Sequence, residues 1–468
     1  MCTTRYIHTS KYMKTVFITS SESSVPRLLL RGGFLGGLSR RGAKVVLLVS
    51  PQEEEEYEKE FGAVATVVGV PPLRASVRRE SIISFIARNA HPSRTIRWVH
   101  KEQYFFDGNV LRLFSRCLVR FCLGFLPFTP ALIRVFDLLF IRFDPAVGRI
   151  FDEYHPDAVL STMLFRENDI RVAREARRRR IPLAGMVRSW DNLTTYGYIR
   201  TIPDTFVAQS EFIADMARRY QRFPAETIKI SGTPLYDLYA GKEILWSREK
   251  FLSRYGFPAD AKIVLYGAMG TFLFSKENEM ISVLERLAEK YAGRLYCIFR
   301  AHPSFPVEPD VMRRSRRIFI EQPGTEVKGS RENLKERRRM LRGDEEIYIN
   351  TLYHADVIVT AASSVSVDAI LFDRPVITID FDPSIPPAGC RSVRGFHKYF
   401  THLREAMKCR GMWKVESEEE LEQAVGAYLK NPASHKEGRS CIRERFIEPF
   451  DGKSIERLEE IIIEKLEK

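Results

Sequence analysis

Hydrophobic positions along the chain fall into two kinds of segment that alternate over most of its length. Short uninterrupted apolar runs have the length of buried strands, and the segments between them carry an apolar stripe at helical spacing. The first unit comprises the run Lys14–Ser20, the amphipathic segment Arg27–Arg40 and the run Lys44–Ser50. This order of strand, helix and strand predicts a Rossmann-like start to the fold.

Similar apolar runs recur and predict further buried strands. They are Asp157–Ser161, Pro182–Val187, Thr205–Gln209, Thr227–Ser231, Lys262–Tyr266, Leu295–Phe299, Val357–Val359 and Val376–Ile379. The alternation occurs twice, and the charged stretch Lys242–Tyr255 separates the two halves. We therefore predict an α/β protein with two Rossmann-like domains that face each other across a cleft. The expected division is a disordered leader in 1–13, an N-terminal domain in 14–240, a C-terminal domain in 241–450 and a C-terminal helix in 451–468.

The most informative stretch runs from Asp356 to Asp382, where a predicted strand, loop, helix and second strand follow one another. Ser363 and Ser364 lie where the helix begins, and the free backbone N–H groups there favour an anion such as a phosphate. Asp368 follows Ser364 by one helical turn, so its carboxylate is placed to bind a nearby sugar hydroxyl. The alternative for this unit is an ordinary helix capped by serine.

Two other predicted strands of the second half end in loops that suit the same ligand. Gly270 and Thr271 follow the strand Lys262–Tyr266, and such small residues let backbone amides approach a phosphate closely. Arg300 and His302 follow the strand Leu295–Phe299, where they suit an anionic leaving group or proton transfer. A purely structural role is the alternative for His302.

One loop of the first half carries a candidate acceptor site. The segment Arg188–Gly197 follows a predicted strand, at the position where α/β proteins bind ligands. Trp190 and Asn192 are candidates to contact an acceptor there, and Asp191 is the candidate general base. The alternative is an Asx turn made by Asp191 or Asn192.

The segment 104–150 combines aromatic and basic residues at helical spacing. One stripe is apolar and consists of Leu111, Phe114, Leu118, Phe121 and Phe125, and another consists of Arg112, Arg116 and Arg120. The arginines and prolines argue against a membrane span. Two interpretations stay open: core helices with a solvated basic face, or an amphipathic patch lying on an anionic bilayer surface.

Composition narrows the class of partner and the chemistry. The formal net charge of +13 over 468 residues favours anionic partners, namely nucleotides, acidic lipids or nucleic acid. Nucleic acid ranks last, because the arginines are scattered and stacking aromatics are nearly absent from the Arg-rich segment 313–342. The seven cysteines show no metal-site spacing, which predicts buried thiols in a reducing cytoplasm. Asp380-Phe381-Asp382 resembles a metal-binding DxD, but we expect no metal, since basic residues can carry the charge of a leaving group.

The segments in 180–460 resemble CDP-glycerol glycerophosphotransferases of teichoic-acid synthesis and, more broadly, glycosyltransferases of the two-Rossmann (GT-B) fold. The resemblance implies a nucleotide-diphosphate donor held mainly by the C-terminal domain and an acceptor facing the N-terminal domain. The matching positions are Gly232, Pro234 and Asp237 of a Gly-x-Pro-x-x-Asp motif; His302-Pro303; Ala355, Asp356, Thr360, Ser363, Ser364, Asp368 and Pro375-Val376-Ile377 of one long signature; and Asp451-Gly452-Lys453 with Glu456-Arg457.

The chain departs from that family at two places. Ala361 and Ala362 stand where the signature has Asp-Tyr, and Trp190-Asp191-Asn192 stands where the family has Trp-His-Gly with a catalytic His. Because a carboxylate base suits the deprotonation of a sugar hydroxyl, we favour a sugar as the transferred group.

The expected function is that of a GT-B glycosyltransferase that moves a sugar from a nucleotide-diphosphate donor to a cell-envelope glycan or lipid-linked acceptor. The alternatives are a CDP-glycerol glycerophosphotransferase, an enzyme similar to UDP-GlcNAc 2-epimerases, and an inactive nucleotide-sugar-binding protein. We expect no cofactor, because the donor is itself a substrate, and no nucleic-acid partner. The expected location is the cytoplasm, with peripheral contact at the inner face of the cell membrane.

Overall fold

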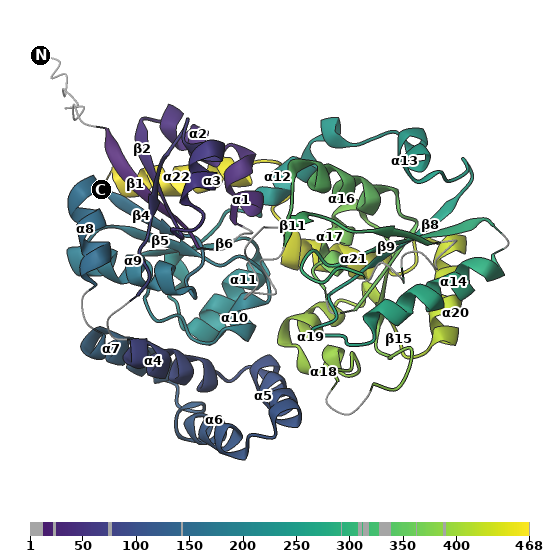
Figure 1. Ribbon diagram of the computed structural model, residues 1–468, viewed down its shortest axis with the longest axis horizontal. Helices are drawn as coiled ribbons and strands as arrows, with labels where there is room; N and C mark the ends of the chain where they lie inside the picture. The colour runs from purple at the N-terminus through teal and green to yellow at the C-terminus, as the bar shows by residue number, and fades with distance from the viewer. Residues whose placement is uncertain are drawn as a thin grey trace, which may run out of the picture.

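The computed structural model describes residues 13–21, 25–73, 77–141, 144–291, 293–307, 311, 318–326, 338–361, 363–386 and 390–467 (Figure 1). Within them, the N-terminal half forms a parallel seven-stranded sheet in the order β3-β2-β1-β4-β5-β6-β7. Its strands are β1 (Lys14–Ser20), β2 (Ala43–Val49), β3 (Thr66–Gly69), β4 (Ala158–Ser161), β5 (Leu183–Met186), β6 (Thr205–Ala208) and β7 (Ile228–Ile230).

The C-terminal half repeats this architecture. Its described residues form a parallel six-stranded sheet in the order β10-β9-β8-β13-β14-β15. The strands are β8 (Lys262–Gly267), β9 (Leu295–Arg300), β10 (Ile318–Glu321), β13 (Val357–Thr360), β14 (Val376–Ile379) and β15 (Met412–Val415). A short antiparallel ladder joins β11 (Thr325–Glu326) to β12 (Arg338–Arg339). The prediction of an α/β protein with two Rossmann-like domains is confirmed.

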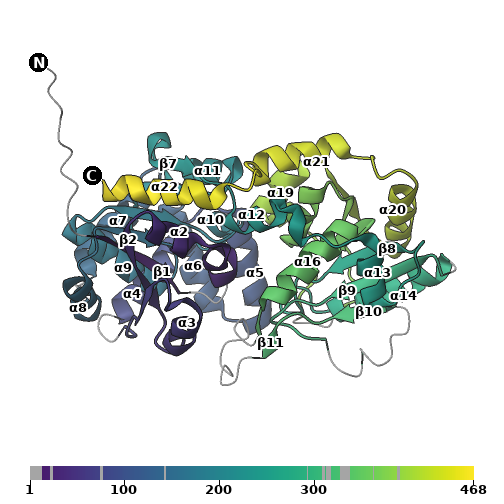
Figure 2. The ribbon, with the colours of Figure 1, turned by 90° about the horizontal axis from the view of Figure 1, so that it is seen from above.

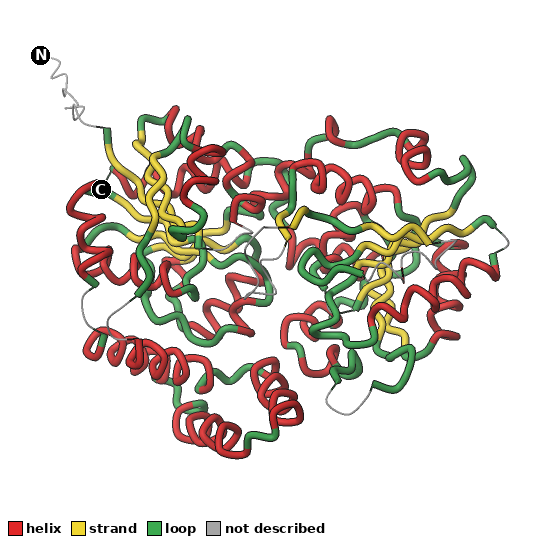
Figure 3. The backbone as a smooth tube through the Cα atoms, in the orientation of Figure 1, coloured by secondary structure: helices red, strands yellow, loops and turns green. Residues whose placement is uncertain are grey.

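Helices flank both sheets, as Figure 3 shows. In the N-terminal half they are α1 (Val25–Leu28), α2 (Phe34–Arg40), α3 (Glu54–Phe61), α4 (Val77–Asn89), α5 (Arg94–Asp107), α6 (Val110–Leu123), α7 (Thr129–Phe140), α8 (Pro145–Tyr154), α9 (Glu167–Arg179), α10 (Asn192–Thr195), α11 (Glu211–Met216) and α12 (Pro234–Ala240). In the C-terminal half they are α13 (Arg248–Tyr255), α14 (Met280–Lys290), α16 (Arg342–His354), α17 (Val365–Asp368), α18 (Phe396–Tyr399), α19 (Thr401–Met407), α20 (Glu418–Lys430) and α21 (Lys436–Ile442).

The last helix, α22 (Ser454–Leu466), returns to the first half of the molecule (Figure 2). Leu458, Ile461 and Ile462 on it pack into the same core as residues of β1 and β2. Burial of these side chains stabilises the docked helix by about 1.5–3 kcal/mol each relative to leaving them in water. The chain therefore crosses between the two halves twice.

Helical segments deviate from prediction where glycine intervenes or where helices are short. The predicted helix Arg27–Arg40 is divided into α1, a 3₁₀ turn (Leu30–Gly32) and α2, because Gly33 adopts a left-handed backbone with φ +91°. The helix after Ser364 is a single turn, α17, continued as a 3₁₀ turn (Ala369–Phe372).

The interpretation of α6 as a core helix with a solvated basic face is wrong. Leu111, Phe121 and Phe125 are 78–79% exposed, whereas Arg116 of the basic stripe is only 8% exposed. The helix packs instead through Val119 and Leu123, against a small buried cluster that contains Ala87 of α4 and Ile133 of α7. Among the described residues, no helix combines the length and apolar character needed to cross a membrane.

The prediction of buried cysteine thiols holds for Cys297 alone among the cysteines in the described ranges. Cys117, Cys122 and Cys390 are exposed. Cys409 and Cys441 form a disulfide that joins the segments after α19 and at the end of α21. Cys2 lies outside the described residues.

Candidate active site

The register of the second sheet brings the predicted donor-binding loops to one edge. Thr360 of β13 lies beside Gly267 of β8, and Gly267 lies beside Arg300 of β9. Because these neighbouring strands are parallel, the loops that follow them leave from the same edge of the sheet. Ser363 and Ser364, Gly270 and Thr271, and His302 all lie in these loops or at their ends.

The Gly270 loop and the His302 loop pack against each other through Phe305. Gly270 has φ +102°, and a Cβ there would lie 2.4 Å from the Phe305 ring, so only glycine fits. The centroids of the His302 and Phe305 rings are 5.3 Å apart, and the Ser304 amide donates to His302 Nδ1 at 3.1 Å. The imidazole is therefore oriented by its own turn.

A buried glutamate that the sequence did not reveal occupies the glycine loop. The Met269 and Gly270 amides donate to the two carboxyl oxygens of Glu277, at 2.8 and 2.6 Å. Burial raises the pKa of Glu277 to about 7, against the opposing effect of these two hydrogen bonds. The predicted approach of the Gly270 amide to a phosphate is thus incorrect for this conformation. In sequence, Glu277 stands in a charged run typical of a helix surface.

Arg300 is engaged in a buried ion pair rather than presented to a ligand. Its guanidinium binds Glu321 of β10, donates to the Asp344 carbonyl at 3.2 Å and stacks over the Tyr348 ring at 5.0 Å. Both members of the pair are under 10% exposed. In the structure the partner of Arg300 is therefore Glu321 and not a ligand. Arg300 could bind a departing phosphate, as expected from the sequence, only if this ion pair opened.

Asp368 is held by two tyrosine hydroxyls. Tyr236 of α12 donates to Oδ1 and Tyr348 of α16 donates to Oδ2, each at 2.7 Å. Ser364, one turn earlier, is exposed, and its side chain makes no capping hydrogen bond. The alternative prediction, a helix capped by the Ser364 side chain, is therefore wrong. The Ser363 hydroxyl does accept weakly from the Val365 amide, at 3.4 Å.

In the first half, the loop after β5 is shaped by Asn192. This side chain is fully buried, and its carbonyl oxygen accepts from the Arg188 and Ser189 amides at 3.0 and 2.9 Å. The predicted acceptor contact at Asn192 is wrong, because no surface of this side chain is exposed to an acceptor. The Asx-turn alternative is also wrong for Asn192, because its side chain accepts from amides three and four residues earlier and not from one two residues later.

Asp191 and Trp190 lie where the two halves of the molecule meet. The Trp190 ring packs 4.9 Å from His402 of α19, and the Asp191 carboxylate accepts from the Thr195 hydroxyl at 3.2 Å. Burial lowers the pKa of His402 to about 4, against the opposing effect of the Asp191 carboxylate. His402 was not predicted, because it is more than 200 residues from Asp191 in the sequence.

The Asp-x-Asp segment organises its own loop. Asp380 accepts from the Gly395 amide at 2.6 Å and pairs with His397 at 3.5 Å, while Asp382 accepts from the Val393 amide at 3.1 Å. In the part of the chain that the structure describes, no three His, Cys, Asp or Glu side chains gather as a metal site would need.

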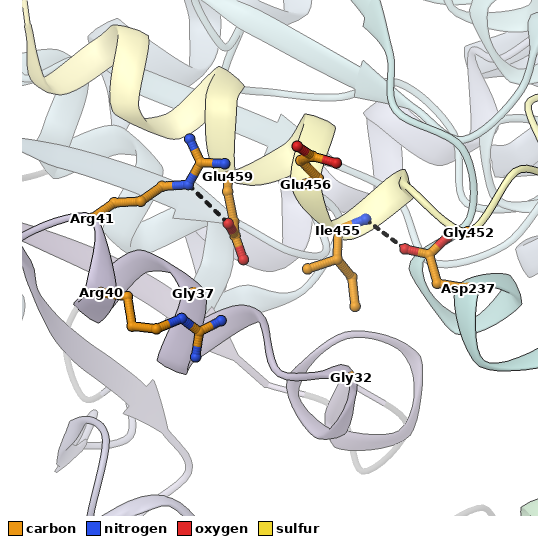
Figure 4. A pocket seen from close by; sticks show the side chains of 9 residues that line it. All are labelled: Gly32, Gly37, Arg40, Arg41, Asp237, Gly452, Ile455, Glu456 and Glu459. Carbon is orange, nitrogen blue, oxygen red and sulfur yellow. Dashed lines mark hydrogen bonds and ion pairs between the residues drawn. The ribbon is translucent and has the colours of Figure 1, made fainter. Parts of the chain in front are cut away.

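Two segments that resembled family motifs interlock: the loop after β7 with the start of α12, and the start of α22. Asp237 accepts from the Ser454 and Ile455 amides at 2.9 and 2.8 Å and so caps α22 (Figure 4). A Cβ at Gly232, which has φ +86°, would lie 2.4 Å from the Ser454 hydroxyl. The open pocket of about 430 Å³ beside this junction is lined by none of the predicted site residues.

A small cavity of about 30 Å³ marks the carboxyl ends of β4, β5 and β6. Thr162, Arg188 and Gln209 contribute to its lining. Gln209 Oε1 is buried without a hydrogen-bond partner, and its amide nitrogen donates to the Val187 carbonyl. These residues border the predicted acceptor side. Arg188 belongs to the predicted acceptor loop, whereas no motif in the sequence distinguished Thr162 or Gln209.

The match to a protein family covers residues 186–464, which include both candidate sites. The family is described as CDP-glycerol:poly(glycerophosphate) glycerophosphotransferase. The chain belongs to this family. It is accordingly a transferase that uses a nucleotide-linked donor. A search of curated proteins gave no significant match.

Solved structures share the fold at low sequence identity. UDP-GlcNAc 2-epimerase from Neisseria meningitidis bound to UDP-GlcNAc is 10% identical, with a TM-score of 0.54 and coverage of 97% of this chain and 99% of that one. The 2-epimerase from Methanocaldococcus jannaschii is 13% identical, with a TM-score of 0.51 and coverage of 97% and 100%. The glycotransferase of kitacinnamycin is 12% identical, with a TM-score of 0.51 and coverage of 96% and 98%. These likenesses support the GT-B fold predicted from the sequence.

Proposed function

We propose that this transferase moves a sugar from a nucleotide-diphosphate donor to a hydroxyl group of a cell-envelope glycan or lipid-linked acceptor. The observation that carries the proposal is Asp191, a carboxylate at the junction of the two halves, where the family has a histidine. Asp191 is neither ion-paired nor fully buried in the described structure, so it can accept a proton. Carboxylates are common general bases toward sugar hydroxyls.

On the donor side, the diphosphate is proposed to lie at the Ser363–Ser364 turn, where Ser364 is exposed, with the Thr271 side chain facing it. Asp368 is proposed to bind a ribose or sugar hydroxyl, since its carboxylate already accepts hydrogen bonds from two hydroxyl groups and each carboxylate oxygen can accept more than one. His302, oriented by the Ser304 amide, is proposed to stabilise the departing phosphate.

The chemistry follows from these positions. Asp191 takes the proton of the acceptor hydroxyl, and the acceptor oxygen forms a bond to the anomeric carbon of the donor sugar. The bond between that carbon and the phosphate oxygen breaks, and a nucleoside diphosphate leaves beside His302. No metal or cofactor is proposed, and the whole charge on the leaving group is assigned to protein groups.

A second candidate function is the transfer of glycerol phosphate from CDP-glycerol, which the family match over residues 186–464 favours. In that reaction the acceptor oxygen attacks the phosphorus that carries glycerol, and CMP leaves. The same donor loops serve both reactions, so the two differ in the atom attacked and in the nucleotide released.

The proposed place of work is the cytoplasm, at the inner face of the cell membrane. A lipid-linked acceptor presents its reactive hydroxyl there. The Cys409–Cys441 disulfide is unusual for this compartment, because cytoplasmic proteins seldom keep disulfides.

Thermal unfolding with a donor panel tests the proposal. A ligand that binds only the folded protein raises the melting temperature according to its occupancy. UDP-glucose, UDP-N-acetylglucosamine and CDP-glycerol would be compared with UDP and CMP. Stabilisation by a sugar nucleotide supports sugar transfer, and stabilisation by CDP-glycerol alone replaces it with the second candidate. Asp368→Ala should lose the stabilisation, whereas the control Asp215→Ala, at a half-exposed position on α11, should keep it.

A further inference from the structure

Helix α6 presents an apolar face that no described part of the protein covers. Leu111, Phe114, Leu118 and Phe121 recur at helical spacing on α6, and Phe125 follows two residues after its end. The exposed fractions of these five side chains range from 49% to 79%. We call these five residues the α6 apolar face. Monomeric proteins in water rarely expose contiguous large apolar side chains in this way, so such a surface marks a docking site.

The exposure is not a sign of a poorly packed helix. The opposite side of α6 packs into the protein through Val119 and Leu123. Asn109 caps the start of the helix, since its side chain accepts from the Arg112 amide at 2.8 Å. The helix is therefore anchored on one side and apolar on the other. The next helix, α7, also exposes Leu138 and Leu139, at 73% and 70%.

The helices next to this face carry a surplus of positive charge. The segment 77–140, which contains α4 to α7, has ten Lys and Arg residues against four Asp and Glu residues. On α5, Arg94, Arg97 and Lys101 are exposed and repeat at helical spacing, so they form a basic stripe. Helices α5 and α6 contact each other. Burial, and then the charge of Arg97, lower the pKa of Arg120 on α6 to about 10. The stripe thus runs beside α6.

We infer that the α6 apolar face docks onto an anionic lipid bilayer, with the phenylalanine and leucine side chains in the acyl boundary and the α5 basic stripe over the headgroups. Apolar burial combined with attraction to anionic lipids is how interfacial helices bind membranes. A second protein chain would satisfy the apolar face but would leave the surplus positive charge without a counterpart.

The position of helices α5 and α6 suits a lipid-linked acceptor. On its inner side α5 contacts both halves of the molecule: Ser93, its cap, donates to the Thr194 carbonyl of α10 at 2.6 Å, and Trp98 packs against Phe396 of α18 at 5.0 Å. Figure 1 shows α5 and α6 together below the junction of the two halves. A bilayer on the α6 face would therefore lie on the side of the molecule where α10 follows Asp191. Only this link to the acceptor rests on the proposed function.

Vesicle co-sedimentation tests the inference on the full-length protein without any donor. The probes are phosphatidylcholine vesicles and vesicles of phosphatidylcholine with phosphatidylglycerol. We expect binding to the anionic vesicles, with Phe121→Gln/Phe125→Gln lowering the partition coefficient by about tenfold or more. The matched control Val64→Gln/Ile385→Gln also removes two exposed apolar side chains, 41% and 92% exposed, and should bind like the wild type.

Two further measurements make the result decisive. Arg94→Gln/Arg97→Gln/Lys101→Gln should weaken binding to anionic vesicles and reduce its salt dependence. If Phe121→Gln/Phe125→Gln does not fold, Leu111→Gln/Phe114→Gln replaces it. Equal sedimentation of wild type and α6 variants overturns the inference, as does a wild-type dimer in sedimentation velocity that these variants abolish. A protein that binds vesicles but no donor would refute the proposed function alone.

Discussion

The Tyr236 hydroxyl donates a 2.7 Å hydrogen bond to the Asp368 carboxylate. Tyr236 lies in α12, directly after the first sheet, and Asp368 lies in the single-turn helix after β13 of the second sheet. Tyr348 donates to the other carboxylate oxygen at the same distance. The Asp368 carboxylate, the candidate donor-binding group, is therefore held by one tyrosine from each half of the molecule. These hydrogen bonds orient it before a ligand binds.

The first prediction concerns this arrangement. Tyr236→Phe should lower the free energy of unfolding by about 1 kcal/mol, and Asp368→Ala by about 1–3 kcal/mol because it removes the carboxylate that accepts hydrogen bonds from two tyrosine hydroxyls. Donor-induced thermal stabilisation should disappear in Asp368→Ala and persist in Tyr236→Phe. Urea unfolding and thermal shift measure the two effects. Full donor stabilisation of Asp368→Ala would exclude this residue from the donor site.

The second prediction concerns His302. Replacing it with alanine should reduce donor turnover by about 10²-fold or more, because the charge on the leaving phosphate loses its partner. The melting temperature should change little, since the ring is only half-buried. The control is His155→Asn at an exposed position with φ +44°, where asparagine tolerates the left-handed backbone. An active His302→Ala enzyme would remove His302 from the mechanism.

The third prediction is a pH dependence of stability caused by Glu277. The fold raises the pKa of this carboxyl from 4.5 to about 7. The unfolded chain therefore releases the proton first, and stability should fall as pH rises from about 4.5 to about 7 and then level off, by about 3 kcal/mol in all.

Urea unfolding at several pH values measures this slope. Glu277→Gln should be less stable at low pH, because one loop amide loses its acceptor, but its slope in this range should be smaller than that of the wild type. The control Glu289→Gln, on the exposed side of α14, should keep the wild-type slope. An unchanged slope in Glu277→Gln would mean that another group titrates.

The fourth prediction concerns the disulfide between Cys409 and Cys441, which are 32 residues apart. Closing a loop of this length stabilises a fold by about 2–4 kcal/mol through the unfolded chain, so Cys409→Ala/Cys441→Ala should lose that amount. The control is Cys117→Ser/Cys122→Ser, which replaces two exposed thiols. Peptide mapping without reductant should recover the cross-linked pair, and free thiols at both positions would contradict it.

The sequence predicted the strands well because they are buried on both faces. A short uninterrupted apolar run, as in β1 and β14, is typical of a parallel strand covered on both faces. The observed bounds of β1 and β14 equal the predicted ones. Helices were harder, because an apolar stripe does not say what covers it. In α6 the stripe faces outward and Arg116 is buried, the reverse of the core interpretation.

The sequence predicted which residues lie in the strand-end loops, because their positions follow from the order of strands and helices. It did not predict which side chains from distant segments contact those residues. Strand-end loops place His302 and Ser363 at one edge, as the βα pattern implies. Sequence could not show that Glu321 would engage Arg300, that Glu277 would take the Gly270 amide, or that His402 would lie beside Trp190. Each of these contacts joins segments that the chain brings together only by folding.

The nucleotide released during turnover tests the central claim most directly. Purified enzyme would be incubated with UDP-sugars or CDP-glycerol and a membrane extract as the source of acceptor, and the released nucleotide identified by chromatography. We predict a nucleoside diphosphate from a sugar nucleotide, lost in Asp191→Asn and kept in the control Asp215→Asn. Release of CMP from CDP-glycerol would establish the second candidate instead. An enzyme that binds these donors but releases no nucleotide would contradict group transfer at this site.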